Sequence, residues 1–211
     1  MSVTVLDFPS LNFASADFGL VSNTTSFTSP LSGTTQTLEL PGAHWRGVLD
    51  YPPLNDADKR TLQVFLLKLR GAAGRFYFND PIWKAAGGND GAGTGTPLVN
   101  GGSQIGTSLS VDGFAASVTG ILKSGDYFSF DTTLGRELKM LTADVDSDGS
   151  GNATLTFEPP IRNAPADNAA IEVSNPTTIF RLANDEQVKW AFAGGNIYTG
   201  FQLDVVEAFF K

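Results

Sequence analysis

The sequence predicts a mainly β protein in which one helix packs on a sheet and a second, small β unit is inserted. Three observations support this class. Only 17% of the residues are charged, and Phe occurs 16 times, a composition that favours the half-buried surface of strands. One segment alone repeats its apolar residues with a helical period, whereas many short segments alternate with a period of two. A Gly-rich stretch then divides the chain.

The first strands come before residue 52. The clearest alternation covers residues 44–51, where every second residue from Trp45 to Tyr51 falls on one face. Residues 3–8 and 35–40 are earlier strand candidates. Between these two, residues 22–32 are rich in Ser, Thr and Asn, a composition that predicts a loop or an edge hairpin.

The single predicted helix follows Pro53. Asn55 or Asp56 can cap its first turn, and Gly71 is suited to end it. Its apolar residues recur at the spacing of one helical stripe: Leu62, Phe65, Leu66 and Leu69. One such stripe predicts a helix that lies against a sheet. A strand pattern returns at residues 75–78 and ends at Asn79-Asp80-Pro81.

Residues 85–97 change the character of the chain, because five of these 13 residues are Gly and few have side chains to bury. A domain boundary is expected there. Short strand candidates with turns between them follow, which is typical of a small barrel or sandwich; they are residues 108–111, 120–122, 127–130, 137–141 and 153–157. Pro159-Pro160 and residues 165–168 mark the exit from this unit.

The final stretch contains strand candidates at residues 179–182, 188–192 and 198–210, and the last of these is strongly apolar. Such a segment needs a partner sheet, and the first 84 residues supply one. We therefore predict two domains, with residues 1–84 together with 171–211 forming one and residues 85–170 inserted as the other. Residues 198–210 either pair with another subunit by strand addition or are buried in their own core.

Composition excludes several classes of function. Without cysteine the chain can have no thiol catalysis, cysteine-ligated zinc, iron–sulfur cluster or disulfide. A net charge of −8 argues against specific nucleic-acid binding, because such affinity comes mainly from Lys and Arg contacts to phosphates. Apolar runs such as Phe65-Leu66-Leu67 are too short to span a bilayer, and residues 1–5 do not open a signal peptide. We expect a protein made and kept in aqueous solution.

The sharpest local motif is Asp144-Val145-Asp146-Ser147-Asp148-Gly149, which matches the opening of an EF-hand calcium loop. Leu155 occupies the twelfth position, where the motif requires a bidentate Glu, and strand patterns rather than helices flank the loop. A hairpin turn is therefore favoured. The alternative is an irregular, weak calcium site with Asp144, Asp146 and Asp148 as its ligands.

Other candidate sites lack the residues that their chemistry requires. His44 is the only histidine, with no Gly-x-Ser-x-Gly motif, so it is interpreted as a surface or intersubunit residue. Residues 91–95 contain Gly without the Gly-Lys-Ser/Thr ending of a P-loop, which favours a linker. A glycosidase carboxylate pair is defined by the fold and has no sequence signature. We predict no catalytic residues, no cofactor and no enzymatic activity.

Several motifs spread over most of the chain carry a family resemblance. They are Gly42-Ala43-His44-Trp45-Arg46-Gly47 leading to Tyr51-Pro52-Pro53, the helix end Phe65-Leu66-Leu67-Lys68-Leu69-Arg70-Gly71, Arg75-Phe76-Tyr77-Phe78-Asn79-Asp80-Pro81, Lys123-Ser124-Gly125-Asp126-Tyr127, Leu141-Thr142-Ala143-Asp144, and Asp148-Gly149-Ser150-Gly151-Asn152 through Glu158-Pro159-Pro160-Ile161-Arg162. Together they resemble the distal tail protein of long-tailed, non-contractile bacteriophages, which joins the tail tube to the tail tip.

This resemblance implies a split β-sandwich domain with one packed helix that forms a hexameric ring, and an inserted barrel of the oligonucleotide/oligosaccharide-binding (OB) type outside it. It also implies a location at the phage tail tip in the virion after assembly in the host cytoplasm. The implied partners are the tail tube protein, the baseplate hub or tail tip protein, and side fibres. Alternatives are a tail tube or tail-completion subunit, and a carbohydrate-binding protein for host attachment.

Overall fold

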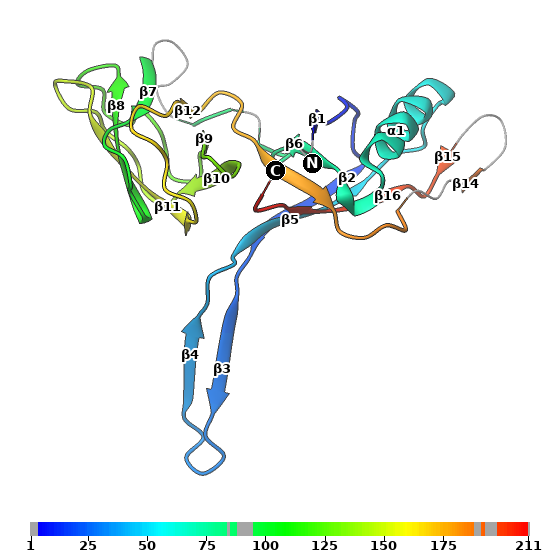
Figure 1. The fold of residues 1–211 in the computed structure, drawn as a ribbon, viewed down its shortest axis with the longest axis horizontal. Helices are drawn as coiled ribbons and strands as arrows, with labels where there is room; N and C mark the ends of the chain where they lie inside the picture. The colour runs from blue at the N-terminus through cyan, green and yellow to red at the C-terminus, as the bar shows by residue number, and fades with distance from the viewer. Residues whose placement is uncertain (1–3, 84, 88–94, 188–190, 193–197, 211) are drawn as a thin grey trace.

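The computed structural model describes residues 4–83, 85–87, 95–187, 191–192 and 198–210. Within them the chain forms one α-helix, two six-stranded sheets and two separate two-stranded hairpins (Figure 1). One of the six-stranded sheets is nearly closed into a barrel. This architecture confirms the predicted fold class of a mainly β protein with one packed helix and a barrel.

The first sheet combines strands from both ends of the chain, in the order β1-β6-β13-β16-β5-β2. Only β1 and β6 are parallel. The strands are β1 (Val5–Asp7), β2 (Ser15–Val21), β5 (His44–Asp50), β6 (Arg75–Phe78), β13 (Thr178–Leu182) and β16 (Gln202–Glu207). Because β16 lies between β13 and β5, its inward residues Leu203 and Val205 are fully buried. The segment 198–210 is thus used for the chain's own core, the second of the two alternatives.

Helix α1 (Asp56–Leu69) begins and ends as predicted. Asn55 is its N-cap, with the side-chain oxygen accepting a hydrogen bond from the Asp58 amide at 2.9 Å. The left-handed residues Arg70 and Gly71, with φ of 53° and 72°, end the helix and lead into the short 3₁₀ helix η1 (Gly71–Ala73). Among the described residues, no helix is both long and apolar enough to cross a membrane.

The first core lies between α1 and the inward face of the first sheet. The predicted stripe of Leu62, Phe65, Leu66 and Leu69 is buried there. Several phenylalanines meet in this layer: Phe8 lies 5.3 Å from both Phe65 and Phe76, measured between ring centroids. The layer that covers the sheet is therefore helix α1 with the segment that follows β1. In a β-sandwich a second sheet would take the place that helix α1 has here.

The second sheet has the order β12-β9-β10-β11-β8-β7. Its strands are β7 (Gly95–Val99), β8 (Gly106–Phe114), β9 (Tyr127–Asp131), β10 (Arg136–Leu141), β11 (Ala153–Ile161) and β12 (Ile171–Glu172). The two end strands approach each other, because the Val99 amide donates to Ala169 O and the Asn168 amide to Val99 O, each at 2.9 Å. These bonds almost close the barrel around a separate apolar core.

Some sequence expectations differ from the structure. Residues 120–122 form no strand, because Gly120 turns the backbone at φ 64° and Leu122 makes only an isolated bridge to Val145. Strands β2 and β7 were not expected. Ile171 and Glu172 pair with β9 in the second sheet, although the sequence assigned them to the first domain. Residues 88–94 of the expected connector and 188–190 of an expected strand lie outside the described residues.

The arm, defined here as the hairpin of β3 (Thr24–Thr28) and β4 (Thr35–Glu39), projects from the body as a two-stranded ribbon (Figure 1). It confirms the hairpin alternative for residues 22–32. In its register Thr25 pairs with Leu38 and Phe27 with Gln36, so Phe27 and Leu38 share one face. Their exposed fractions are 65% and 60%. A second, short hairpin joins β14 (Ala191–Phe192) to β15 (Tyr198–Thr199).

Candidate functional site

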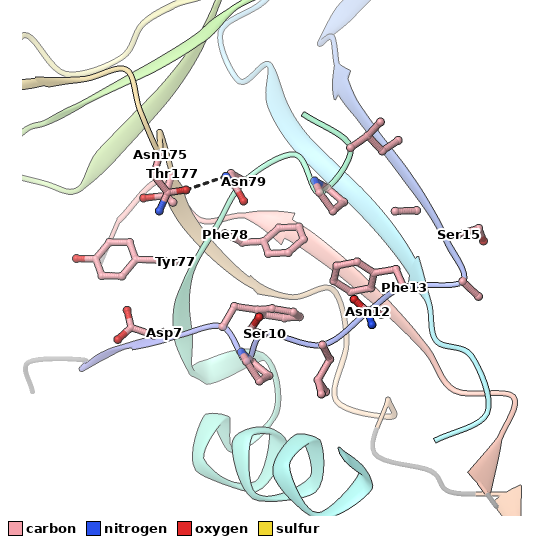
Figure 2. A pocket seen from close by; sticks show the side chains of 17 residues that line it. Asp7, Ser10, Asn12, Phe13, Ser15, Tyr77, Phe78, Asn79, Asn175 and Thr177 are labelled. Atoms are coloured by element: carbon pink, nitrogen blue, oxygen red, sulfur yellow. Dashed lines mark hydrogen bonds between the residues drawn. The ribbon is translucent and has the colours of Figure 1, made fainter. Parts of the chain in front are cut away.

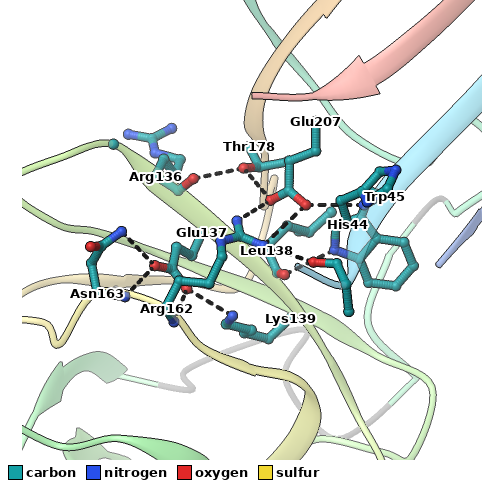
Figure 3. A network of polar contacts seen from close by, with 12 residues as sticks. His44, Trp45, Arg136, Glu137, Leu138, Lys139, Arg162, Asn163, Thr178 and Glu207 are labelled. Atoms are coloured by element: carbon teal, nitrogen blue, oxygen red, sulfur yellow. Dashed lines mark hydrogen bonds and ion pairs between the residues drawn. The ribbon is translucent and has the colours of Figure 1, made fainter. Parts of the chain in front are cut away.

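The first sheet and the barrel are joined along β10 (Figure 3). Side chains of the first sheet donate hydrogen bonds to β10 carbonyls, from Trp45 Nε1 to Leu138 O at 3.0 Å and from Thr178 Oγ1 to Arg136 O at 2.6 Å. Leu138 itself belongs to the first core. Strand β10 is therefore buried on both faces. The carbonyl groups of Arg136 and Leu138 accept hydrogen bonds from side chains of the first sheet.

Glu207 and Arg162 form the main ionic contact of this junction. Glu207 comes from β16 in the first sheet, and its side chain is fully buried, whereas Arg162 follows β11 of the barrel. The same carboxylate accepts hydrogen bonds from the Trp45 amide at 3.0 Å and from Thr178 Oγ1 at 3.2 Å. The Arg162 guanidinium also lies 4.4 Å from the centre of the Phe209 ring. This pair therefore fixes the barrel to the sheet.

A second buried ion pair lies beside it, between Glu137 and Lys139 on β10. Lys139 Nζ is 2.8 Å from Glu137 Oε2 and donates to Pro160 O at 2.9 Å. Glu137 also accepts hydrogen bonds from the amides of Arg162 and Asn163. Burial lowers the pKa of Lys139 despite this partner. Burial alone would raise the pKa of Glu137, but Lys139 and Arg162 together hold that pKa below its usual value.

A polar cleft of about 850 Å³ lies where the segment after β1 diverges from the end of β6 (Figure 2). Amide and hydroxyl side chains line it together with aromatic rings, and Asn79 Nδ2 donates to Asn175 Oδ1 at 3.3 Å. Among the described residues that line the cleft, Asp7 is the one carboxylate. A lone carboxylate supplies no acid–base pair of the kind that glycoside hydrolysis needs.

The three carboxylates of the possible calcium loop accept hydrogen bonds from different parts of the barrel. Asp144 lies 2.8 Å from Lys123 Nζ and accepts from the Ser124 amide, whereas Asp146 accepts from the Gly120 amide at 2.6 Å. Asp148 accepts from the Ser150 and Asn152 amides within its own turn. Within the described part of the chain, no group of three or more His, Asp or Glu side chains could hold a metal ion. The loop has the geometry of a hydrogen-bonded turn between β10 and β11.

We expect Asp148→Ala to lower the melting temperature, because the Ser150 and Asn152 amides of the turn lose their acceptor. Adding EDTA to the wild-type protein is expected to leave its melting temperature unchanged. Thermal unfolding followed by circular dichroism measures both effects. A drop in melting temperature with EDTA that added Ca²⁺ reverses would establish the calcium alternative instead, since a ligand of the folded state stabilises it.

His44 lies at the start of β5, near the base of the arm. Its Nδ1 is 2.9 Å from Gly42 O, and its ring meets the edge of Phe209. These contacts are structural. The sequence interpretation of a surface or intersubunit residue is compatible with its half-buried position but is not tested by it.

Sequence reasoning missed the junction residues Glu137, Lys139, Arg162 and Glu207. The signal was weak but present, since Glu137 and Lys139 alternate with the apolar residues Leu138 and Met140 on one strand. Such alternation ordinarily indicates a strand with one solvated face. Only the packing of the barrel against the first sheet buries both faces of β10.

No protein-family model matches the chain, and no curated protein matches it in sequence. The basis for a functional proposal is therefore the geometry of the described residues, together with the motif resemblance.

Proposed function

We propose that this protein is a structural component of a phage tail tip. In this proposal it forms a hexameric ring that connects the tail tube to the baseplate hub or tip, and it has no catalytic role. The inserted barrel lies outside the ring, where side fibres can attach. The protein then resides in the virion and is assembled in the host cytoplasm.

The observation that carries this proposal is the arm. All ten residues of β3 and β4 are exposed, and they include the large apolar side chains Phe27 and Leu38. An isolated two-stranded hairpin is at best marginally stable in water, and exposed apolar surface of this kind marks an interaction site. An extended arm that finds no cover on its own chain is suited to a neighbouring subunit.

The edges of the first sheet support the same proposal. Strand β1 ends the sheet on one side and β2 on the other, and neither has a further partner strand among the described residues. Two unlike edges allow head-to-tail contacts, which generate a closed ring when the rotation between copies closes. The hydrogen bonds and the ion pair of the junction along β10 hold the barrel against the first sheet on each copy, as a repeating assembly requires.

Native mass spectrometry of the purified chain tests the ring. We expect a species of six copies, and negative-stain electron microscopy should show single rings. Stacks of rings at the same concentration would favour the tail tube alternative. A strict monomer throughout the micromolar range would contradict the proposal.

A further inference from the structure

A corner groove of about 620 Å³ lies at the base of the arm, between the arm, the barrel and the C-terminal residues. Leu40, Pro159, Pro160 and Phe210 give it an apolar lining, and Phe210 is 59% exposed. Leu40 follows Leu38 by two residues, so the apolar face of the arm continues from this groove. The groove and the apolar face of the arm form one continuous apolar surface. The groove lies where this surface bends at the base of the arm, and this place is called the corner below.

Two carboxylates border this corner. Glu39 lines the groove, and Glu158 precedes the Pro159-Pro160 lining. Burial and then the charge of Glu39 raise the pKa of Glu158, and the charge of Lys139 partly opposes this. The nearby cations Arg162 and Lys139 are already paired with Glu207 and Glu137. The corner thus offers apolar surface with uncompensated negative charge.

The outer side of α1 has the complementary character. Arg60, Val64, Leu67 and Lys68 fall on one exposed helical stripe, at i, i+4, i+7 and i+8. Val64 and Leu67 are 51% and 62% exposed. A groove of about 580 Å³ runs beside this stripe, and its charged lining residues are Arg60, Lys68 and Asp7. Residues 56–70 hold four of the chain's 14 Lys and Arg residues and two carboxylates, Asp56 and Asp58, which leaves a net charge of +2. Arg60 is paired with Asp56 at 2.7 Å on the exposed side of the helix.

Charge selects the occupant of the corner. The chain carries a net charge of −8, so most contacts between copies would be repulsive. The α1 segment is one of the locally basic parts of the chain, and residues 21–38, which include all of the arm except Glu39, carry no charge at all. We propose that the α1 stripe of one copy docks in the corner groove of the next, with Val64 and Leu67 on the arm's apolar face and Arg60 and Lys68 near Glu39 and Glu158. This inference rests on the proposed ring and names its contact.

Two different patches on each copy make this contact heterologous, so it repeats around the assembly. Opposite charges across an interface also fix the register and suppress wrong contacts. In this contact the arm of one subunit packs against α1 of the adjacent subunit.

Disulfide trapping tests the contact directly, because the natural chain contains no cysteine. Two variants, Leu38→Cys and Val64→Cys, are mixed in denaturant, refolded together and oxidised. We expect a covalent dimer from the mixture and little from either variant alone. The matched control replaces Leu38→Cys by Thr37→Cys, which lies on the opposite face of the same strand and should give at least tenfold less dimer.

Charge reversal provides the second test. Glu39→Lys with Glu158→Lys, or Arg60→Glu with Lys68→Glu, is expected to raise the concentration for half-assembly at least tenfold. Combining all four changes should restore assembly to within about threefold of wild type. Reversal of the exposed Lys123–Asp144 pair, as Lys123→Glu with Asp144→Lys, is the control and should leave assembly unchanged.

The outcomes separate this contact from the ring itself. A wild-type hexamer that shows no Leu38–Val64 dimer and ignores both charge reversals would overturn the docking contact, leave the ring intact and assign the corner to a different protein. A wild-type monomer would overturn the ring, and with it the contact.

Discussion

Replacing Lys139 by methionine is expected to lower the free energy of unfolding by about 3 to 5 kcal/mol. Lys139 is fully buried, and its ammonium group is the ionic partner of the Glu137 carboxylate. The substitution keeps the apolar stem but leaves Glu137 charged in a site that is closed to water. Removing one member of a buried ion pair costs this much, because the remaining charge is uncompensated. Urea unfolding at a fixed protein concentration measures the change.

The double variant Glu137→Gln with Lys139→Met is the control for this interpretation. A neutral amide at position 137 can still accept the hydrogen bonds from the Arg162 and Asn163 amides. We therefore expect the double variant to regain more than half of the lost stability. If it is as unstable as the single variant, the loss comes from packing and not from the unpaired charge.

Replacing Arg162 by alanine is expected to cost about 3 kcal/mol and to separate the unfolding of the barrel from that of the first sheet. Glu207 would keep its bonds to Trp45 and Thr178 but lose its cation inside the junction. The contact between guanidinium and Phe209 would also be lost. Calorimetry is expected to show one transition for the wild type and two for the variant.

Arg46→Ala is the matched control for Arg162→Ala. Arg46 also pairs with a β16 residue, Asp204, but at 3.8 Å and with half of its side chain exposed. Exposed pairs contribute at most about 1 kcal/mol, so this variant should unfold in one transition close to that of wild type. An equal effect of both substitutions would show that the junction has no special role in joining the two sheets.

Local patterns were sufficient to predict much of the fold. The cap at Asn55, the stripe from Leu62 to Leu69 and the stop at Gly71 depend on residues within one helix. The alternation in residues 44–51 likewise predicted which side chains of β5 are buried. Signals of this kind can be read locally because hydrogen bonding and periodicity act between near neighbours.

Strands without a regular signal were less predictable. Strand β2 places Phe18 and Leu20 toward the core, but it also contains Asp17 and Gly19, which are rare in strands. Strand β12 is only two residues long. Pairing with a neighbouring strand decides such segments, and the neighbour can be distant in sequence.

The sequence by itself determined the fold class, the single helix and the absence of cysteine chemistry, because composition and short-range periodicity fix these properties. Tertiary structure alone decided the functional geometry. It buried both faces of β10, paired Arg162 with Glu207 across 45 positions of the chain, and left the arm uncovered while β16 became a central strand. Burial and long-range charge pairing depend on which elements pack against each other. A local sequence pattern does not specify that packing.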